Sequence, residues 1–244
     1  KSPQNLFGNN DASVALAIVK PNGDIYPAQL GALIKLAKKY NKYIVVRGGG
    51  SGVCGAAVPR FGERTVVVDM TDIKWVTVCK NGPSVITGAG IMGLELENIL
   101  NEKGYTHGHS PASLAISTPG GWVATRSSGQ FSSRYGNIEN LVMGIEVIDP
   151  EGNCRWIDKS ELDHYFRMEG TTGIITRVEL TVTPSPKFRK FAAYSFAKLD
   201  DALYCMTILK HQRLFMEDKG VYLSAIRLYD FLDWKMFSKP HKAK

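Results

Sequence analysis

The sequence predicts an α+β protein with one large domain, residues 1–186, and the beginning of a second, residues 187–244. Three observations carry this expectation. The chain opens with a strand–helix–strand pattern, an Asn81-Gly82 turn then joins two strands, and a proline-rich segment, residues 183–186, precedes a second strand–helix–strand pattern. A strand–helix–strand unit favours a parallel sheet, whereas an Asn-Gly turn pairs antiparallel neighbours. The 244 residues suffice for one large or two small domains at about 100–200 residues each.

Short apolar runs and one amphipathic segment make up the first half of the large domain, about residues 1–70. Apolar residues from Leu30 to Tyr40 recur at helical spacing behind Pro27, and proline often opens a helix. A glycine-rich loop follows the strand expected after this helix. The expected elements are, in order, a strand at residues 14–19, a helix from residue 27, and strands at residues 43–46 and 65–69.

The second half of the large domain, about residues 71–186, indicates a hairpin, a helix and two further strands. Gly104 ends the helix, and residues 105–128 are so rich in Gly, Pro, Ser and Thr that we expect mostly ligand-facing loop. One strand–helix–strand start is too little to close a sheet, so the second domain is expected to be a partial cap domain. The expected elements are strands at 75–78 and 84–87, a helix at 93–103, strands at 141–148 and 174–182, and, after the linker, a strand at 191–196, a helix at 199–211 and a strand at 221–228.

Composition and charge exclude several classes of protein. Apolar residues make up 44% and charged residues 22%, values of a folded protein rather than of a disordered chain. No apolar run reaches the roughly 18 residues of a membrane-spanning helix. The net charge of +7 suits an anionic ligand, but no basic stripe interleaved with aromatic residues indicates nucleic acid. The four cysteines are too far apart for a zinc pair, and we expect free thiols in a reducing, cytoplasmic compartment.

Two glycine-rich loops match the G-x-G-x-x-G pattern of nicotinamide-binding proteins without its context. The first, residues 50–55, is not followed by a helix, because Pro59 and Gly62 interrupt the short stretch before the next strand. The second, residues 88–93, opens a helix but has no acidic residue about 20 positions later to hold a ribose. No Lys-Ser or Lys-Thr pair follows either loop, which excludes a Walker A site.

The glycines at residues 48–52 nevertheless predict an anion site. With almost no Cβ atoms in the turn, consecutive backbone N–H groups are able to point at one anion. Arg47 adds a positive charge with bidentate geometry, and a diphosphate suits both features. A loop packed tightly under a helix is the alternative. On the first interpretation Gly49→Val blocks binding, because its added atoms occupy the place of the diphosphate.

Four segments carry a resemblance to a known family. They are the loop at residues 46–52, the central segments at residues 111–117 and 120–129, the Tyr-Gly-Asn-Ile-Glu segment at residues 135–139, and Glu-Gly-Thr-Thr-Gly-Ile-Ile-Thr at residues 169–176. In order and approximate spacing they resemble the vanillyl-alcohol-oxidase-type (PCMH) FAD-binding family. The resemblance covers roughly residues 14–186 and implies an FAD domain of two α/β subdomains followed by an α/β cap. Within this family the local sequence of these segments is most similar to that of the alkyldihydroxyacetonephosphate synthases. The order of the segments also resembles that of D-lactate and glycolate dehydrogenases.

By this resemblance the cofactor is FAD. The loop backbone would bind the diphosphate, short hydroxyls of the central segments would meet phosphate, ribose or ring edges, and the Gly120-Gly121 pair would let the backbone approach the flavin. Where many relatives carry a histidine bonded to the flavin, this chain has Ser51, so non-covalent FAD is expected. The implied cofactor-binding residues are Val46, Arg47, Gly48, Gly49, Gly50, Ser51, Gly52, Pro111, Ser113, Ser117, Gly120, Gly121, Thr125, Arg126, Ser127, Ser128, Glu169, Gly170, Thr171, Gly173, Ile174 and Ile175.

Three functions follow from the resemblance. The first is an FAD-dependent oxidoreductase acting on a small D-2-hydroxy acid such as D-lactate or glycolate. The second is an alkyldihydroxyacetonephosphate-synthase-like enzyme of ether-lipid synthesis, which uses FAD without net redox. The third is a flavin-binding subunit without a substrate site of its own. A small anionic substrate is the expected ligand, and a homodimer and a multi-subunit redox partner are both open.

One basic residue and two histidines complete the candidates. The segment Ile226-Arg227-Leu228-Tyr229-Asp230 resembles a cap segment whose arginine lies near the flavin, so Arg227 is the predicted catalytic residue, with an ion pair to Asp230 as the alternative. His107 and His109 would point opposite ways on a strand and have no carboxylate close in sequence. We therefore expect no metal site.

Overall fold

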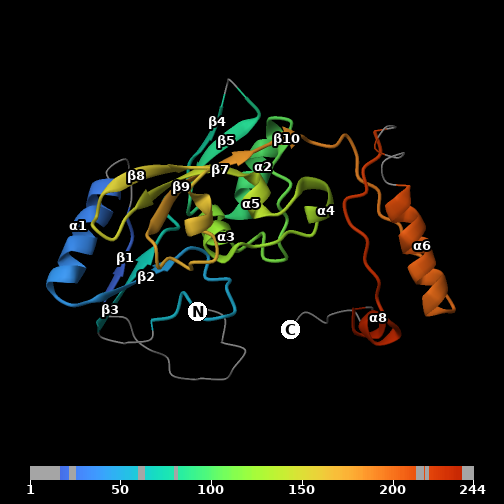
Figure 1. The fold of residues 1–244 in the computed structure, drawn as a ribbon, viewed down its shortest axis with the longest axis horizontal. Helices are drawn as coiled ribbons and strands as arrows, with labels where there is room; N and C mark the ends of the chain where they lie inside the picture. The colour runs from blue at the N-terminus through green and yellow to red at the C-terminus, as the bar shows by residue number, and fades with distance from the viewer. Residues whose placement is uncertain are drawn as a thin grey trace. The chain divides into compact units, whose positions relative to one another are not determined.

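The computed structural model describes residues 17–21, 26–59, 64–79, 82–212, 217 and 220–237 (Figure 1). The chain divides into two compact units, Lys1–Pro186 and Lys187–Lys244. Among the described residues, none of the helices combines the length and apolar character that crossing a bilayer requires. The four cysteines are free thiols.

A small parallel sheet opens the first unit, as the strand–helix–strand pattern predicts. Its strands β1 (Ala17–Val19), β3 (Thr65–Asp69) and β2 (Tyr43–Arg47) lie in the order β1-β3-β2. The central strand β3 is buried along its whole length, which explains its uninterrupted Val-Val-Val core. Helix α1 (Tyr26–Lys39) lies beside this sheet (Figure 1). Residues 14–16 of the predicted first strand lie outside the described residues.

A five-stranded antiparallel sheet forms the rest of the framework. The hairpin predicted around Asn81-Gly82 is present as an antiparallel pair, although Asn81 itself lies outside the described residues. The strand at residues 154–158 was not predicted, because only Ile157 of its five residues is buried and the alternation is weak. In sheet order the strands are β4 (Val76–Val78), β5 (Ser84–Gly88), β9 (Ile174–Thr181), β7 (Val142–Ile148) and β8 (Cys154–Asp158).

The segment at residues 105–128 contains more regular structure than the predicted loop. Helix α3 (Pro119–Thr125) begins after Thr118, whose Oγ1 accepts a hydrogen bond from the backbone N–H of Gly121 at 3.4 Å, and it ends at Arg126 with a left-handed φ of 49°. Two adjacent glycines lower the intrinsic helix propensity of this stretch. Tertiary packing compensates, because Trp122 and Val123 are fully buried.

Four further helices occur in the described part of the first unit, and the predicted linker is partly structured. Thr183–Pro184 forms strand β10, which pairs antiparallel with β6 (Tyr105–Thr106), so the first half of the predicted linker belongs to the first unit. The predicted helix at residues 93–103 is present as α2 (Gly93–Glu102). The others are α4 (Ser132–Tyr135), α5 (Ile138–Leu141) and the 3-10 helix η2 (Leu162–His164).

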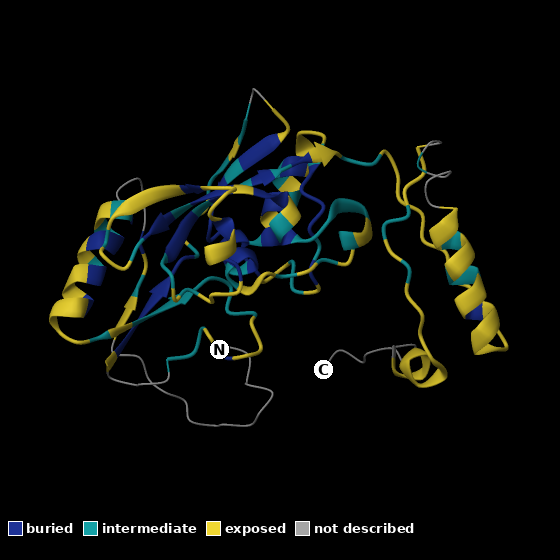
Figure 2. Cartoon of the chain, viewed as in Figure 1, coloured by how far each residue is buried: buried dark blue, intermediate teal, exposed yellow. Residues whose placement is uncertain are grey.

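Two buried clusters hold the first unit together. The larger one packs the antiparallel sheet against α2, α3 and α5. The smaller one joins Leu30 and Ile34 of α1 to Val68 of the parallel sheet and to Ile148 and Ile174 of the antiparallel sheet. Figure 2 shows these buried residues as dark blue along the sheets. The two sheets therefore share one core beneath α1.

The second unit has helices but not the predicted strands. Helix α6 (Leu199–His211) has the predicted bounds, and α8 (Phe231–Phe237) follows it. Residues 191–196 and 221–228 form no strand, so both strand predictions were wrong. A strand needs a hydrogen-bonded neighbour, and the described residues of this unit supply none. Ala202 is the one buried residue among them.

Candidate functional site

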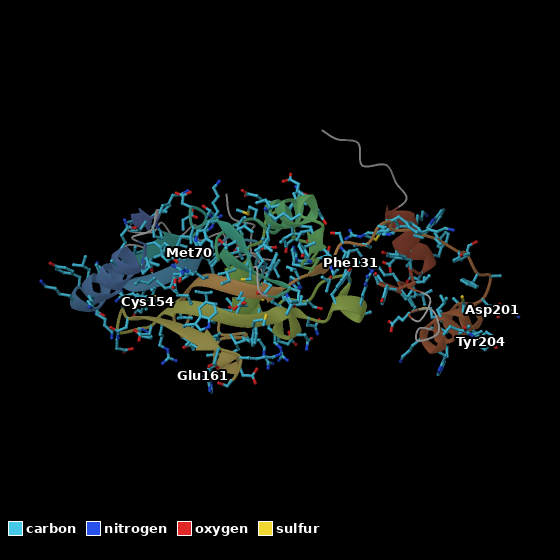
Figure 3. The ribbon with its side chains drawn as sticks, turned by 90° about the horizontal axis from the view of Figure 1, so that it is seen from above. Met70, Phe131, Cys154, Glu161, Asp201 and Tyr204 are labelled. Atoms are coloured by element: carbon cyan, nitrogen blue, oxygen red, sulfur yellow. The ribbon has the colours of Figure 1, made fainter. Side chains whose placement is uncertain are left out.

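A pocket of about 390 Å³ lies between loops of the two sheets. That volume is within the range of small-molecule sites, about 300–1,000 Å³. We call the lining residues among 46–57, together with Met70, the first wall. The lining residues among 113–127 and 169–175, together with Ala89, are the second wall. Met70, labelled in Figure 3, belongs both to the first wall and to the shared core. The predicted residues that line this pocket are Val46, Gly48, Gly49, Gly50, Ser51, Gly52, Ser113, Ser117, Gly120, Gly121, Thr125, Ser127, Glu169, Gly170, Gly173 and Ile175.

The first wall contains a row of backbone amides without a hydrogen-bond partner among the described residues. Among the described residues, the backbone N–H groups from Gly49 to Val53 donate no hydrogen bond to another protein group. All five residues line the pocket. Consecutive free N–H groups in a turn form a concave anion site, because their partial positive charges add. Binding of a diphosphate by this loop stays a prediction, for which these amides supply the donors.

The glycines of this loop have different roles. A Cβ atom on Gly48 would collide with the Thr118 side chain, and one on Gly49 with the backbone carbonyl oxygen of Ile116. These two glycines let the first wall pack directly on the second. The expectation that Gly49→Val acts by filling the place of the diphosphate is therefore wrong, since the added atoms meet the protein before they meet a ligand. At Gly52 a Cβ would meet nothing within 4 Å, so that position faces open space.

The Arg47 guanidinium lies outside the pocket lining. Its Nη1 is 4.0 Å from Oδ2 of Asp69, and Lys20 Nζ is 3.7 Å from the same oxygen. Burial of Asp69 acts to raise the pKa of this carboxyl, but hydrogen bonds from Thr71 and the two cations lower it overall. Arg47 therefore neutralises Asp69 beside the loop.

Five other predicted residues also lie outside this pocket. Arg126 Nε donates to Glu139 Oε1 at 3.0 Å, and Ser128 Oγ donates to Asn137 Oδ1 at 2.7 Å. Pro111 lies in the turn before Ser113 and does not line the pocket. Thr171 and Ile174 line a second pocket of about 240 Å³, which shares Val46, Gly170 and Gly173 with the first. The two pockets therefore adjoin each other.

Most hydroxyls of the second wall already bond to the protein. Ser117 Oγ accepts from Trp122 Nε1 at 2.8 Å, and Thr125 Oγ1 donates to the Gly121 carbonyl at 2.9 Å. Ser127 Oγ lies 2.8 Å from His109 Nε2. By contrast, the hydroxyls of Ser51 and Ser113 have no partner within the described part of the chain. These two are the side-chain hydroxyls best placed to bind a ligand.

Two buried histidines support the second wall from behind. The His107 and His109 rings both pack on Trp122, with ring centroids 5.3 and 4.8 Å away, and residues 107–109 form no strand. The expectation that these side chains point opposite ways on a strand was therefore wrong. His107 Nδ1 accepts a hydrogen bond from the backbone N–H of His109 at 3.1 Å, which places the proton of the neutral ring on Nε2. That Nε2 is 3.2 Å from Glu97 Oε2, but the alignment is too poor for a hydrogen bond. No cluster of metal ligands occurs in the ranges that the structure covers.

Because these histidines are buried, we expect the free energy of unfolding to fall in mild acid. Burial lowers the pKa of His107 and of His109 from 6.5 to about 4. Between pH 4 and pH 6.5 the unfolded chain binds more protons than the folded one. The contribution of the neutral histidines to the free energy of unfolding is therefore fully present above about pH 6.5 and declines toward pH 4. The free energy of unfolding should be about 2 kcal/mol lower per ring at pH 5 than at pH 7. Urea unfolding at the two pH values measures this difference.

The control is His164, which is exposed. His164→Gln should leave the difference between the two pH values unchanged, whereas His107→Gln should reduce it. An equal difference in all three proteins would assign the acid sensitivity to other groups.

Arg227 lies in the second unit, where it is exposed. Its Nη1 donates to the Tyr229 hydroxyl at 3.4 Å. No ion pair between Arg227 and Asp230 occurs among the described side chains; Asp230 Oδ1 instead accepts the backbone N–H of Asp233 at the start of α8. Its predicted catalytic role stays a prediction.

Several lining residues were not predicted, and most of them are apolar. They include Val53, Cys54, Met70, Ala89, Trp122 and Ala124, together with Thr118. Met70 and Ala89 follow strands β3 and β5 directly, and ligands commonly bind at strand ends. That placement could have identified them. Trp122 lies within the central segment at residues 120–129, but only the fold shows that it forms part of the wall.

Comparison with known proteins identifies similar chains. A family model described as "FAD binding domain" matches residues 16–158. The chain is 33% identical over 207 residues to alkyldihydroxyacetonephosphate synthase of Dictyostelium discoideum, covering 81% of this chain and 33% of that protein. It is 58% identical over 147 residues to the FAD-linked oxidoreductase YgcU of Escherichia coli, covering 57% of this chain and 29% of that protein. It is 25% identical over 224 residues to D-lactate dehydrogenase of Archaeoglobus fulgidus, covering 86% of this chain and 49% of that protein.

A solved structure of alkyldihydroxyacetonephosphate synthase matches with a TM-score of 0.64 and 36% identity, covering 70% of this chain and 32% of that one. The chain spans about a third of the length of the first curated relatives it matches. These relatives extend well beyond the part that the two units represent.

Proposed function

The chain belongs to the FAD-binding domain family, and from this premise we propose that it is the flavin-binding part of an oxidoreductase acting on a small D-2-hydroxy acid. The observation that carries the proposal is the row of free amides from Gly49 to Val53 on the pocket wall. The 58% identity to an FAD-linked oxidoreductase and the similarity to a D-lactate dehydrogenase support the reaction class.

The residues of the pocket fit FAD. Its diphosphate would accept hydrogen bonds from the free amides, and Ser51 and Ser113 would add hydroxyl donors. Val46, Val53 and Ala124 line the pocket without being fully buried and offer apolar surface for a flat ring system. When bound, FAD accepts the two electrons that an alcohol carbon gives up on oxidation.

The proposed substrate carries a negatively charged carboxylate, which the protein has to bind. Oxidation of a 2-hydroxy acid to a 2-oxo acid removes two electrons and two protons, and the carboxylate stays charged throughout. A cation must therefore hold that carboxylate, and Arg227 is the residue that we propose for this task. A homodimer and a multi-subunit redox partner are both compatible with this reaction.

A synthase-like reaction on an ester of dihydroxyacetone phosphate is the second candidate. It is favoured by the 33% identity to a synthase and by the solved synthase structures. A phosphate-bearing substrate also suits the net charge of +7. In this case FAD would act without net oxidation of the substrate.

Anaerobic absorption spectroscopy of the FAD-loaded full chain tests these proposals. D-lactate or glycolate should abolish the absorption of oxidised flavin if the first proposal holds, with the 2-oxo acid formed in equal amount. Formation of alkyl-dihydroxyacetone phosphate from the acyl ester and a fatty alcohol would support the second. If neither reaction occurred, the result would favour a flavin-binding subunit without a substrate site of its own.

The flavin should be released completely when the loaded protein is precipitated with acid. Ser51 replaces a covalently bonding histidine, and His109 is buried with Nε2 beside Ser127. The measurement is flavin absorption in supernatant and pellet. Colour in the pellet would show a covalent bond. Cys54 is exposed and lines the pocket, so Cys54→Ala would then show whether its thiol forms that bond.

A further inference from the structure

We propose that Tyr26 is a positioning residue which, through Glu146 and Arg177, sets the spacing of the two pocket walls and thereby the affinity for FAD. The inference rests on the proposed function, because it takes this pocket to be the FAD site. Tyr26 does not line the pocket, so its effect must pass through the elements that carry the walls.

Helix α1 contacts both halves of the first unit. Leu30 and Ile34 pack with Ile148 and Ile174 of the antiparallel sheet in the shared core. Apolar contacts of this kind have no preferred direction. Helix α1 also reaches the β7–β8 turn, where Gly31 packs closely on Gly152 and Lys38 Nζ lies 3.5 Å from Glu151 Oε1 in an exposed ion pair. A more buried directional interaction adds to these contacts in fixing the position of α1.

Tyr26 supplies this directional interaction at the first residue of α1. Its hydroxyl donates to Glu146 Oε1 at 2.9 Å and accepts from Arg177 Nε at 2.6 Å. Arg177 Nε also lies 3.1 Å from Glu146 Oε1, which closes a triangle of three polar groups. Tyr26 is only 3% exposed and the Glu146 side chain 13%, so water competes weakly for the bond between them, whereas the Arg177 side chain is 40% exposed.

The network lies next to both walls along the chain. Helix α1 leads through a short turn into β2, and β2 leads directly into the glycine loop of the first wall. On the other side, Arg177 and Thr176 follow Ile175 of the second wall, and Thr176 Oγ1 donates to Glu146 Oε1 at 2.8 Å. A shift of α1 relative to Glu146 therefore changes the distance between the walls.

The Tyr26 hydroxyl keeps its proton over the physiological range. Burial raises the pKa of Tyr26 to about 12; the hydrogen bond from Arg177 opposes this, and Glu146 adds to it. Glu146 also interacts with the thiol of Cys154, labelled in Figure 3, and adds to the effect of burial in raising the pKa of that thiol. Tyr26→Phe would thus remove the polar link to α1 while leaving the partners of Glu146 on the sheet in place.

The experiment compares the full-length wild type with Tyr26→Phe and Ser84→Ala. Fluorescence titration gives the Kd for FAD, and thermal unfolding of the apoprotein gives stability. Ser84 is the matched control, because its hydroxyl donates to Glu179 at 2.8 Å within the same sheet and it lies outside the pocket. Loss of both hydrogen bonds of the Tyr26 hydroxyl in Tyr26→Phe should raise the Kd for FAD about fivefold. Ser84→Ala should lower the stability of the apoprotein and leave the Kd unchanged. Arg177→Lys, which loses the Nε donor, is a second variant expected to raise the Kd.

Each outcome decides the question. An unchanged Kd in both Tyr26→Phe and Arg177→Lys would overturn the inference while leaving the FAD site intact. An equal rise in Ser84→Ala would also overturn it, because general loss of stability would then explain the effect. Failure of the wild type to bind FAD would instead contradict the proposed function and the inference together.

Discussion

Replacement of Gly52 by valine is expected to raise the Kd for FAD about a hundredfold, which corresponds to about 3 kcal/mol. Gly52 lines the pocket within the row of free amides, and a Cβ at this position meets no protein atom within 4 Å. The valine side chain would thus extend toward the ligand rather than into the protein. Fluorescence titration of the apoprotein with FAD measures the change, and thermal unfolding of the apoprotein should show almost none.

Gly82→Val is the matched control. A Cβ on Gly82 would also meet nothing within 4 Å, but this glycine lies in the β4–β5 hairpin outside the pocket. The variant should keep the wild-type affinity. A wild-type affinity in Gly52→Val would show that the diphosphate lies elsewhere.

Replacement of Gly49 by alanine is expected to act on the fold. Its Cβ would collide with the carbonyl oxygen of Ile116, so the two walls would have to separate or the loop would have to move. Overpacking of this kind costs about 3 kcal/mol of the free energy of unfolding. Urea unfolding of the apoprotein, without any flavin, should therefore reveal the loss.

Gly52→Ala in the same loop provides the comparison for Gly49→Ala. Its methyl group faces open space, and the free energy of unfolding should stay within about 0.5 kcal/mol of the wild type. If Gly49→Ala were as stable as Gly52→Ala, the close packing of the two walls would not be what requires glycine at position 49.

Local pattern predicted much of the framework of the first unit. The parallel start, the hairpin and helix α2 follow from hydrophobic periodicity and turn residues, which act over a few neighbours. The loop itself was also predictable from its run of glycines, although Gly48 and Gly49 serve the close packing of the two walls and its role as an anion site stays a prediction. By contrast, strand β8 and helix α3 depend on partners distant in sequence: β8 pairs with β7, and α3 is stabilised by the burial of Trp122.

The site was predictable as a set of segments but not as a set of contacts. Arg47 and Arg126 carry charges that suit a diphosphate, yet in the fold they form ion pairs with Asp69 and Glu139. The network joins Tyr26 to Glu146 and Arg177, each more than a hundred positions further along the chain, and no local pattern marks it. The prediction of two strands in the second unit was wrong for a related reason, because strand propensity without a pairing partner produces no sheet.

The core shared beneath α1 has a consequence for how the first unit denatures. Leu30 and Ile34 are buried partly by Ile148 and Ile174, so neither half retains a complete interior when the other melts. Loss of structure should therefore be all-or-none across both halves, with a single heat-absorption peak. A ligand held between the halves would leave in that same event, and supplying it in excess would raise the melting temperature of the entire unit.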